Sequence, residues 1–301
     1  MNPPTLSVLI PTYNRRDRLE RCLTALQAQS LDSSEFEVLV MNDGSTDGTE
    51  VFLKDLQEKW PSLGFHTKKN EGQGLARNLG VSFAKGSILV FIDDDIYVTP
   101  DFLKHHLEFH SKFPQETHAA LGLTEWWDGQ KITPLMEWMT SKRGVQFAYP
   151  LLSEGQEASF WFFYTSNLSI KKSLLLKENF DADFRGYGWE DTELGYRLQK
   201  KHHMKLIYAP ECLAHHDNPM DEEFLKKRCL KVAQSAKIFE SKHPELQVIP
   251  RGFKRLAFEL ISCAPILWIL KALACLAPKH LKPWFWYVLS KRYFLRGLKS
   301  V

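Results

Sequence analysis

The sequence predicts an α/β fold in which a mostly parallel β-sheet is flanked by helices. Over the first hundred residues, short apolar runs alternate with segments of helical periodicity, a pattern typical of successive βαβ units. Polar clusters follow the apolar runs directly, as they do where an open sheet holds a ligand at the carboxyl ends of its strands. The 301 residues are enough for one large α/β domain, or for a domain of about 200 to 250 residues with an appendage.

Four apolar runs are the predicted strands, at residues 6–10, 36–41, 64–68 and 87–92. Three helices are predicted between them, at residues 15–29, 46–59 and 73–84. The first helix has its apolar residues at helical spacing, and Asn14 is available as its N-cap. Polar residues follow the first, second and fourth strands, so three loops are expected to converge on one crevice.

Three consecutive aspartates directly follow the strand at 87–92. In an extended chain successive side chains alternate faces, so Asp93 and Asp95 point the same way and Asp94 points to the other side. Two carboxylates on one face can hold a hard cation, and oxygen ligands at this place suit Mg²⁺ or Mn²⁺ carrying a phosphate better than Zn²⁺. A solvated acidic turn is the alternative interpretation of the same residues.

The second half of the chain is marked by aromatic and acidic groups. Aromatic residues crowd into residues 124–165, which predicts either core packing or a platform for a sugar ring or a lipid tail. A second acidic group lies at residues 186–193 and leads into a helical run at 194–201. After a short predicted strand at 205–209 come the paired histidines His215 and His216. A further helix is predicted at 222–241.

The net charge of +3 hides an uneven distribution. Residues 251–301 contain ten Lys or Arg and the single acid Glu259, so this tail carries about +9 and residues 1–250 about −6. Five cysteines without a Cys-x-x-Cys pair predict neither a disulfide framework nor a zinc knuckle. The first strand is reached without a secretory leader, and the longest uncharged apolar stretch, residues 260–270, is too short to span a bilayer. A cytosolic protein is therefore expected.

Taken in order, the motifs between residues 6 and 217 resemble those of a family 2 inverting glycosyltransferase with the GT-A fold. The matching segments are Ser7–Asn14, Asn42–Asp47, Asn70–Asn78, Asp93–Asp95, Asn167–Ile170 and Trp189–Leu194. Several segments that match in order are more specific than any one of them. The resemblance implies a nucleotide-sugar-binding half at residues 1–110 and an acceptor-binding, catalytic half at 111–245. Residues 246–301 are then a basic, apolar, helical appendage.

The resemblance places the sugar donor on the first half of the domain. The donor contacts that it implies are Pro11, Tyr13, Asp43, Arg77, Asp93 and Asp94. Asp43 matches the position whose carboxylate accepts a hydrogen bond from a uracil ring, which favours a UDP-sugar over GDP-sugars and dTDP-sugars. Asn42 stands where the family usually has an acid, a departure from the pattern.

The resemblance also implies a divalent cation, Mn²⁺ or Mg²⁺, with Asp93 and Asp95 as ligands. Such a cation stabilises the negative charge that the nucleoside diphosphate gains as the glycosidic bond breaks. A third ligand is expected from the end of a later strand, where His215 and His216 are the candidates. The sequence context favours His216, and a surface histidine pair is the alternative.

Inverting transfer needs a carboxylate on the face of the sugar opposite the leaving diphosphate. The resemblance assigns this base to Asp191, places Glu190 on an acceptor hydroxyl and stacks Trp189 on the acceptor. Asn167 is a further acceptor-side position. Acids in the first turn of a helix also favour the positive end of its dipole, so helix capping is the alternative explanation, and both can hold at once.

Residues 251–301 lie outside the resemblance and combine apolar area, aromatic residues and positive charge. Segments of this composition lie in the headgroup region of anionic membranes. This predicts peripheral contact with the inner face of the plasma membrane, and with it a glycan or lipid-linked acceptor in polysaccharide biosynthesis. A helical hairpin packed on the catalytic domain, or an oligomer contact, is the alternative. Nucleic acid is not an expected partner, because no recognised module accompanies the charge.

Two other functions are compatible with the same residues. One is sugar transfer to a polyprenyl phosphate, whose anionic acceptor needs no base, so that Asp191→Asn would leave turnover nearly intact. The other is a non-catalytic carbohydrate-binding or membrane-binding scaffold that kept the fold. The complete set of acids argues against the scaffold, and an absence of metal-dependent nucleotide binding would favour it.

Overall fold

The computed structural model describes residues 3–300, which form two compact units. The first unit contains residues 3–130, 152–185 and 190–218, and the second contains residues 131–151, 186–189 and 219–300. The predicted boundaries near residues 110 and 245 separate donor, acceptor and tail functions, and they stay a prediction.

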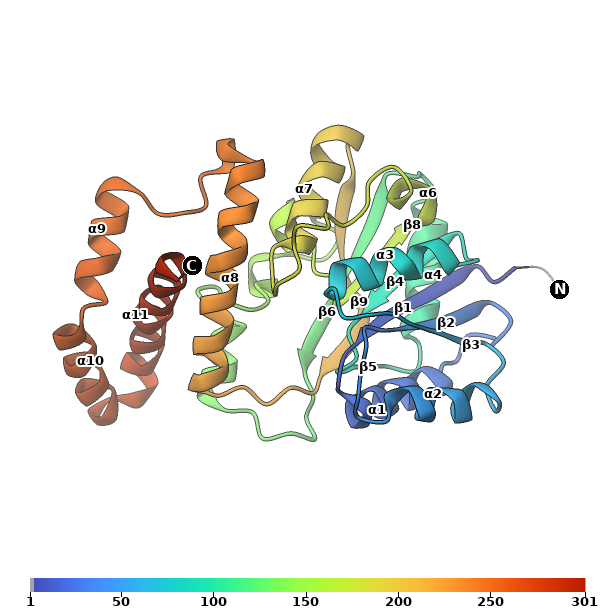
Figure 1. Ribbon diagram of the computed structural model, residues 1–301, viewed down its shortest axis with the longest axis horizontal. Helices are drawn as coiled ribbons and strands as arrows, with labels where there is room; N and C mark the ends of the chain where they lie inside the picture. Colours follow the sequence, from blue (N-terminus) through green and yellow to red (C-terminus); the bar gives the residue numbers. More distant parts are fainter. Residues whose placement is uncertain (1–2, 301) are drawn as a thin grey trace. The chain divides into compact units, whose positions relative to one another are not determined.

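The strands of the described chain all belong to the first unit and form one nine-stranded sheet (Figure 1). They are β1 Leu6–Thr12, β2 Phe36–Asn42, β3 Leu63–Thr67, β4 Ile88–Ile92, β5 Ile96–Val98, β6 His118–Trp126, β7 Glu157–Ala158, β8 Asn167–Lys171 and β9 Lys205–His216. The order is β3-β2-β1-β4-β8-β6-β9-β5, and β7 pairs with β9. The first four strands lie within two residues of their predicted bounds and pair in parallel, whereas β8 is antiparallel to both of its neighbours.

The helices of the first unit are α1 Arg16–Gln27, α2 Thr49–Gln57, α3 Gln73–Phe83, α4 Phe102–Lys112, the 3₁₀ helix η2 Phe160–Phe162, α6 Lys172–Leu175 and α7 Glu190–His202. The first three lie within three residues of their predicted bounds, and α7 begins four residues before the predicted run at 194–201. α4, η2 and α6 were not predicted. The prediction that Asn14 caps α1 is wrong, because Arg15 is the N-cap residue, and the N–H of Arg16 donates instead to Asp47 Oδ2 at 3.0 Å. Asn14 adopts φ 53°, which asparagine tolerates, and its Oδ1 accepts a hydrogen bond from the Thr46 N–H at 2.7 Å. Asn14 therefore joins the loop after β1 to the loop after β2.

Helices cover both faces of the sheet (Figure 1). α1 and α2 share a core cluster with Val8 of β1. α3 covers the other face, where Gly80 lies against Leu9. Because successive residues of a strand point to opposite faces, Val8 and Leu9 serve two different cores.

Strand β9 is longer than the predicted strand at 205–209 and continues to His216. It pairs in parallel with β6, and the register shifts after Gly122 so that residues 210–212 have no partner in β6. Pro210 therefore lies in an irregularity that interrupts the pairing without ending the strand. The extension carries His215 and His216 alongside β5.

A buried polar network ties α4 to the sheet. His106 Nδ1 and His110 Nε2 lie 2.8 and 2.9 Å from Ser169 Oγ, and His106 Nε2 lies 3.2 Å from Asn167 Oδ1. The Asn167 amide donates to two backbone carbonyls at 2.9 and 2.8 Å. Burial lowers the pKa of His106 to about 3 and the pKa of His110 to about 2, so both rings are neutral at physiological pH.

The aromatic stretch at 124–165 is partly core. Four of its ten rings are buried, namely Trp138, Phe147, Tyr149 and Phe163. Five are half-buried, and Trp161 has 41% of its surface exposed.

The second unit is helical. Its helices are α5 Pro134–Met139, η1 Tyr149–Leu151, α8 Glu222–Lys242, η3 Pro244–Leu246, α9 Gly252–Ile261, α10 Ala264–Leu276 and α11 Pro278–Lys299. The predicted helical character of the tail is thus confirmed in α9, α10 and α11. α8 begins after Asp221, whose side chain accepts a hydrogen bond from the Phe224 N–H at 2.7 Å, and it packs closely on α11 where Gly297 meets Leu230.

Within residues 3–300, no single helix has the length and hydropathy needed to cross a membrane. α9 and α10 meet that criterion only as a pair, with a bend of 54° between them.

We expect Gly122→Ala to lower the free energy of unfolding by about 1 to 3 kcal/mol, because the added Cβ would lie 2.2 Å from Oδ1 of the hydrogen-bonded Asn167 side chain. Urea unfolding followed by circular dichroism measures the change. Gly186→Ala is the matched control, since its Cβ would meet only Ser235 Oγ at 3.4 Å. Equal stabilities of the two variants would contradict this packing argument.

Candidate active site

The acid cluster lies at the carboxyl end of β4, between β4 and β5. The loops that follow β1 and β4 meet there, because Thr12 Oγ1 donates a hydrogen bond to Asp94 Oδ2 at 2.8 Å. The loop after β2 joins them through the bond between Asn14 and Thr46. The three polar loops are therefore in contact around one edge of the sheet, as expected for a ligand site in an open α/β fold.

Two arginines balance the acids of this cluster. Arg15 Nη1 donates to Asp94 Oδ1 at 3.1 Å and to Asp95 Oδ2 at 3.0 Å, and Arg18 Nη1 lies 3.8 Å from Asp95 Oδ2. Burial raises the pKa of Asp94, Arg15 opposes the rise and Asp95 adds to it. Burial also disfavours ionised Asp95, but His216 and both arginines outweigh it and lower the pKa of Asp95.

The structure separates the two candidate histidines. His216 Nε2 lies 3.4 Å from Asp95 Oδ2, and its ring stacks on Trp126 with 5.3 Å between the ring centroids. His215 pairs with Tyr97 across the β5–β9 ladder, and the alternation of the strand turns its side chain to the opposite face. Of the two, His216 is the one beside the acid cluster.

Asp93, Asp95 and His216 together offer two carboxylates and one imidazole. Carboxylate oxygens suit Mg²⁺ and Mn²⁺, and an added imidazole is better matched to Mn²⁺ than to Mg²⁺, so the donor chemistry fits the predicted cation. Within residues 3–300, no three His, Cys, Asp or Glu side chains stand together in the arrangement of a metal centre. Asp95 and His216 are the adjacent pair, and Asp93 makes its closest contact with an arginine.

Arg77 links the two acidic groups that lie far apart in the sequence. It is 1% exposed, its Nη2 donates to Asp93 Oδ1 at 2.6 Å, and its Nη1 lies 3.6 Å from Glu190 Oε1. Gln73, on the first turn of the same helix, donates a short hydrogen bond to Glu190 Oε1. The acid after β4 and the acid that begins α7 are thus held by one guanidinium.

Glu190 and Asp191 occupy the first turn of α7. Burial raises the pKa of Glu190 to about 7, with Asp191 adding to the rise while Arg77 and Gln73 oppose it. Burial also raises the pKa of Asp191, although the Thr192 N–H donates to Asp191 Oδ1 at 2.7 Å. The second oxygen of Glu190 is buried and has no hydrogen-bond partner among the described residues. The pKa of Glu190 is therefore close to neutral pH, and the pKa of Asp191 is shifted upward, which favours proton exchange by these acids.

Asp43 is buried and holds the loop that begins α3. Its carboxylate accepts hydrogen bonds from the N–H groups of Glu71 and Gly72 at 3.0 and 2.9 Å and from Lys68 Nζ at 2.8 Å. Gly72 has φ +98°, and a Cβ there would lie 2.9 Å from the Arg185 carbonyl oxygen, so this position requires glycine. The predicted contact of Asp43 with a nucleobase stays a prediction.

The other predicted donor contacts differ in exposure. Pro11 is buried within β1, whereas Tyr13 is 47% exposed in the loop that follows. Their contacts with a nucleotide stay predictions.

Asn167 and Trp189, the two predicted acceptor contacts, both have hydrogen-bond partners elsewhere in the protein. Asn167 is fully buried, and its amide is engaged in the network beneath α4. Trp189 belongs to the second unit, where its Nε1 donates to the Val232 carbonyl at 2.9 Å and its ring packs on Phe239. Their predicted acceptor contacts stay predictions.

Sequence reasoning missed several residues that shape the site. They are Thr12, Arg15, Arg18, Lys68, Gln73 and Asn218, the last of which donates to Asp95 Oδ2 at 3.1 Å. Arg15 directly follows the first motif and Gln73 lies within the third, so position in the motifs pointed to both. Asn218 lies in the segment around His216 that resembles the family, so its position also carried a signal. Arg18 carries none, because the residue that it donates to at 3.1 Å, Asn218, is 200 residues away in the sequence.

Comparison with known proteins points to one family. Residues 7–120 match the family model described as Glycosyl transferase family 2. Validoxylamine A glucosyltransferase of Streptomyces hygroscopicus subsp. jinggangensis is 31% identical over 218 residues, which cover 65% of this chain and 51% of that protein. A dolichyl N-acetyl-alpha-D-glucosaminyl phosphate 3-beta-D-2,3-diacetamido-2,3-dideoxy-beta-D-glucuronosyltransferase of Methanococcus voltae is 24% identical over 277 residues, with coverage of 88% and 83%.

A solved structure shares the fold. The mannosyltransferase PcManGT from Pyrobaculum calidifontis, in complex with GDP-Man and Mn²⁺, superposes with a TM-score of 0.67 at 18% identity and covers 99% of this chain and 88% of its own. The chain spans only about half to three fifths of the length of three curated relatives that it matches.

We expect Glu190→Gln to gain stability relative to the wild type as the pH rises. Folding raises the pKa of Glu190 from 4.5 to about 7, so its protonated form contributes stability at pH 4.5 and below, and this contribution is lost as the pH rises through about 7. The difference in free energy of unfolding between variant and wild type should shift by on the order of 1 to 3 kcal/mol between pH 5 and pH 7.5, measured by urea titration.

Groups common to both proteins titrate alike, so this difference isolates Glu190. Glu108→Gln, on the exposed side of α4, is the control and should differ from the wild type by the same amount at both pH values. A pH-independent difference for Glu190→Gln would contradict the buried, proton-binding carboxyl.

Proposed function

We propose that this chain, whose residues 7–120 match the family 2 glycosyltransferase model and whose fold is shared with a solved mannosyltransferase, is a family 2 glycosyltransferase that moves a sugar from a nucleotide donor to an acceptor hydroxyl with inversion. The observation that carries the proposal is the buried Arg77, which touches both Asp93 and Glu190. Donor-side and acceptor-side acids then act within one site, as a direct displacement requires. The uracil-binding position at Asp43 favours a UDP-sugar.

Asp191 is the proposed general base. As the acceptor oxygen attacks the anomeric carbon, its proton passes to the Asp191 carboxylate, and the bond from the anomeric carbon to the diphosphate breaks. The nucleoside diphosphate leaves with the bonding electron pair. Burial, which raises the pKa of Asp191, brings its proton affinity closer to the working pH. Glu190, with its second oxygen unpaired in the described structure, is placed to bind an acceptor hydroxyl.

Asp93, Asp95 and His216 are the residues that would hold a divalent cation. When bound, the cation supplies positive charge to the leaving diphosphate. Arg15 and Arg18 contribute fixed positive charge at the same carboxylates. PcManGT was solved with GDP-Man and Mn²⁺, which supports a nucleotide sugar and Mn²⁺ for this chain as well.

A glycan or a lipid-linked sugar at the inner face of the plasma membrane is the proposed acceptor. Support comes from the M. voltae relative, whose name specifies a dolichyl-phosphate-linked acceptor. The tail adds support because its helices expose large apolar side chains among basic residues, including Phe253 at 85% and Trp268 at 77% exposure.

We expect the wild type to hydrolyse one sugar nucleotide slowly in the presence of Mn²⁺, and we expect Asp95→Ala to lower that rate by about 100-fold or more, because a bound cation supplies several kcal/mol of charge stabilisation. A panel of UDP-, GDP- and dTDP-sugars, with and without EDTA, measures release of the nucleoside diphosphate. Asp55→Ala, exposed on α2, is the control and should match the wild type. If no sugar nucleotide in the panel is hydrolysed and calorimetry detects no nucleotide binding, the non-catalytic scaffold is favoured.

We expect Asp191→Asn to lower transfer to a hydroxyl acceptor by about 10²- to 10⁴-fold, the usual contribution of a general base. Nucleotide binding measured by calorimetry should be retained, because Asp191 is not a donor contact. Asp55→Asn is the matched control. If Asp191→Asn turns over almost normally with a polyprenyl phosphate as acceptor, the base assignment is wrong and the alternative reaction applies.

A further inference from the structure

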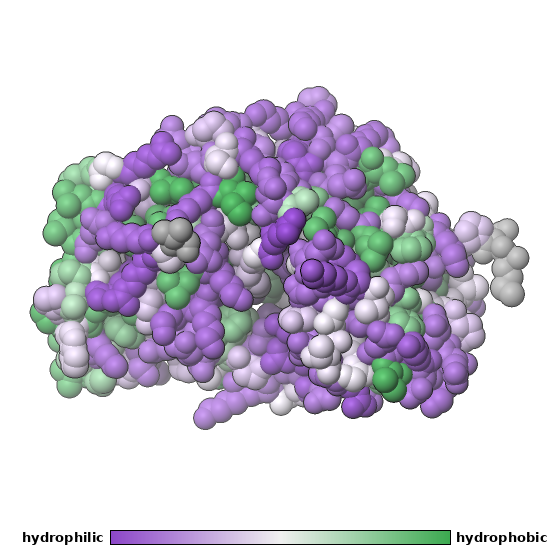
Figure 2. Space-filling view, in the orientation of Figure 1, coloured by the Kyte–Doolittle hydropathy of each residue, from purple (hydrophilic) through white to green (hydrophobic). Residues whose placement is uncertain are grey.

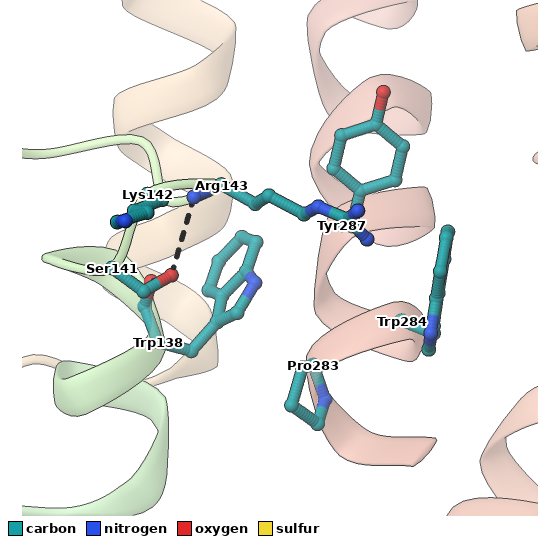
Figure 3. A pocket seen from close by; sticks show the side chains of 7 residues that line it. All are labelled: Trp138, Ser141, Lys142, Arg143, Pro283, Trp284 and Tyr287. Atoms are coloured by element: carbon teal, nitrogen blue, oxygen red, sulfur yellow. Dashed lines mark hydrogen bonds between the residues drawn. The ribbon is translucent and has the colours of Figure 1, made fainter. Parts of the chain in front are cut away.

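The second unit contains a pocket that the proposed transfer reaction does not use. It has a volume of about 570 Å³ and lies between the turn that follows α5 and the start of α11 (Figure 3). The residues that line it are Trp138, Ser141, Lys142, Arg143, Pro283, Trp284 and Tyr287. Three of them are aromatic, two are cationic and none is acidic.

The cations and the aromatic rings are arranged together. The Arg143 guanidinium carbon lies 5.3 Å from the centroid of the Trp284 ring, a cation–π contact across the pocket (Figure 3). Trp138 is buried and packs near Trp286, which stiffens the inner wall, whereas Trp284 is 51% exposed at the mouth. Lys142 and Arg143 are both exposed, so their charges are available to an anion. The pocket thus offers positive charge beside an apolar surface.

Two helices of the same unit, α9 and α10, expose many large apolar side chains. The large apolar side chains that α9 and α10 expose are Phe253, Leu256, Leu260, Ile266, Trp268, Ile269, Leu273 and Leu276. Figure 2 shows apolar patches over these two helices. α11 contacts the segment between α9 and α10, where Arg292 Nη1 donates a hydrogen bond to the Ser262 carbonyl at 2.7 Å. Single exposed apolar residues are normal on a protein surface, but eight on two adjacent helices are typical of an interaction surface.

Charge decides between the possible occupants of this surface. Residues 251–300 carry ten basic side chains and one acid, so two copies of the tail would repel each other. An anionic bilayer attracts them, and its interface accepts tryptophan and lysine side chains with their polar ends in the headgroups. Inorganic phosphate would satisfy the two cations of the pocket but would leave the aromatic walls without a partner.

We propose that this pocket binds the phosphate headgroup of an anionic membrane lipid. The phosphate lies at the guanidinium of Arg143, and the apolar part of the lipid rests on Trp138, Pro283 and Trp284 (Figure 3). The exposed residues of α9 and α10 enter the bilayer interface around it. This inference deepens the membrane contact proposed above and is independent of the transfer chemistry.

The test is flotation of the full chain with vesicles of phosphatidylcholine alone and of phosphatidylcholine with phosphatidylglycerol. The wild type should float with the anionic vesicles only. Arg143→Gln should weaken that binding by about fivefold, the effect of one basic residue at an anionic surface, and Trp284→Ala should weaken it by a similar factor or more. Lys227→Gln, an equal loss of charge at an exposed position of α8, is the matched control and should weaken binding less than twofold.

Three results would overturn the proposal. The first is unchanged vesicle binding by both Arg143→Gln and Trp284→Ala in proteins whose circular dichroism and thermal unfolding match the wild type. The second is an equal loss in Lys227→Gln, which would mean that charge alone drives the association. The third is calorimetric binding of inorganic phosphate, lost in Arg143→Gln, without vesicle binding. Donor hydrolysis in vesicle-free buffer should be unchanged in Arg143→Gln, so a failure of the transfer function is distinguishable from a failure of lipid binding.

Discussion

The active site depends on one buried ionic contact, the guanidinium of Arg77 between Asp93 and Glu190. A buried arginine without partners would be prohibitively unstable, and removing one partner of a buried ion pair typically destabilises a protein by about 3 to 5 kcal/mol. Arg77 comes from α3, Asp93 follows β4 and Glu190 begins α7, so three elements must assemble before the charge is satisfied. The electrostatic requirement of one side chain thereby fixes the positions of two acidic groups that are nearly a hundred residues apart.

The same reasoning explains what could be predicted from the sequence. The first four strands and the helices between them were predicted correctly because their apolar periodicity is local and strong. β5 and β7 were missed because each is two or three residues long and is defined by its pairing with β9 rather than by its own composition. The full length of β9 was missed because Pro210 interrupts the apolar run where the strand merely shifts register.

The site shows a similar division. The acids after β4 and at the start of α7 could be identified from motifs, because short side chains act close to their own backbone. Arg15 and Arg18 could not be placed, because the reach of a long side chain depends on tertiary geometry. Asn167 lies in a motif and also belongs to the core, where its side chain contacts groups on three elements, and its predicted acceptor contact stays a prediction. For the tail, composition predicted helices and basic charge, but only the folded unit reveals which aromatic rings line a pocket and which face outward.

The proposed nucleobase contact would give the carboxylate of Asp43 a second role beside the one that it has in the structure. It already anchors the N–H groups of the loop that begins α3, and Arg77 lies one turn further along that helix. A nucleobase that binds this carboxylate would share it with the N–H groups of the loop. Recognition of the base and positioning of α3 would then depend on the same carboxylate. A nucleotide of the wrong kind would then do more than bind weakly, because it would also disturb the registration of the arginine that joins the two halves of the catalytic machinery. Selectivity for the donor nucleotide and the correct position of Arg77 would then depend on the same hydrogen bonds.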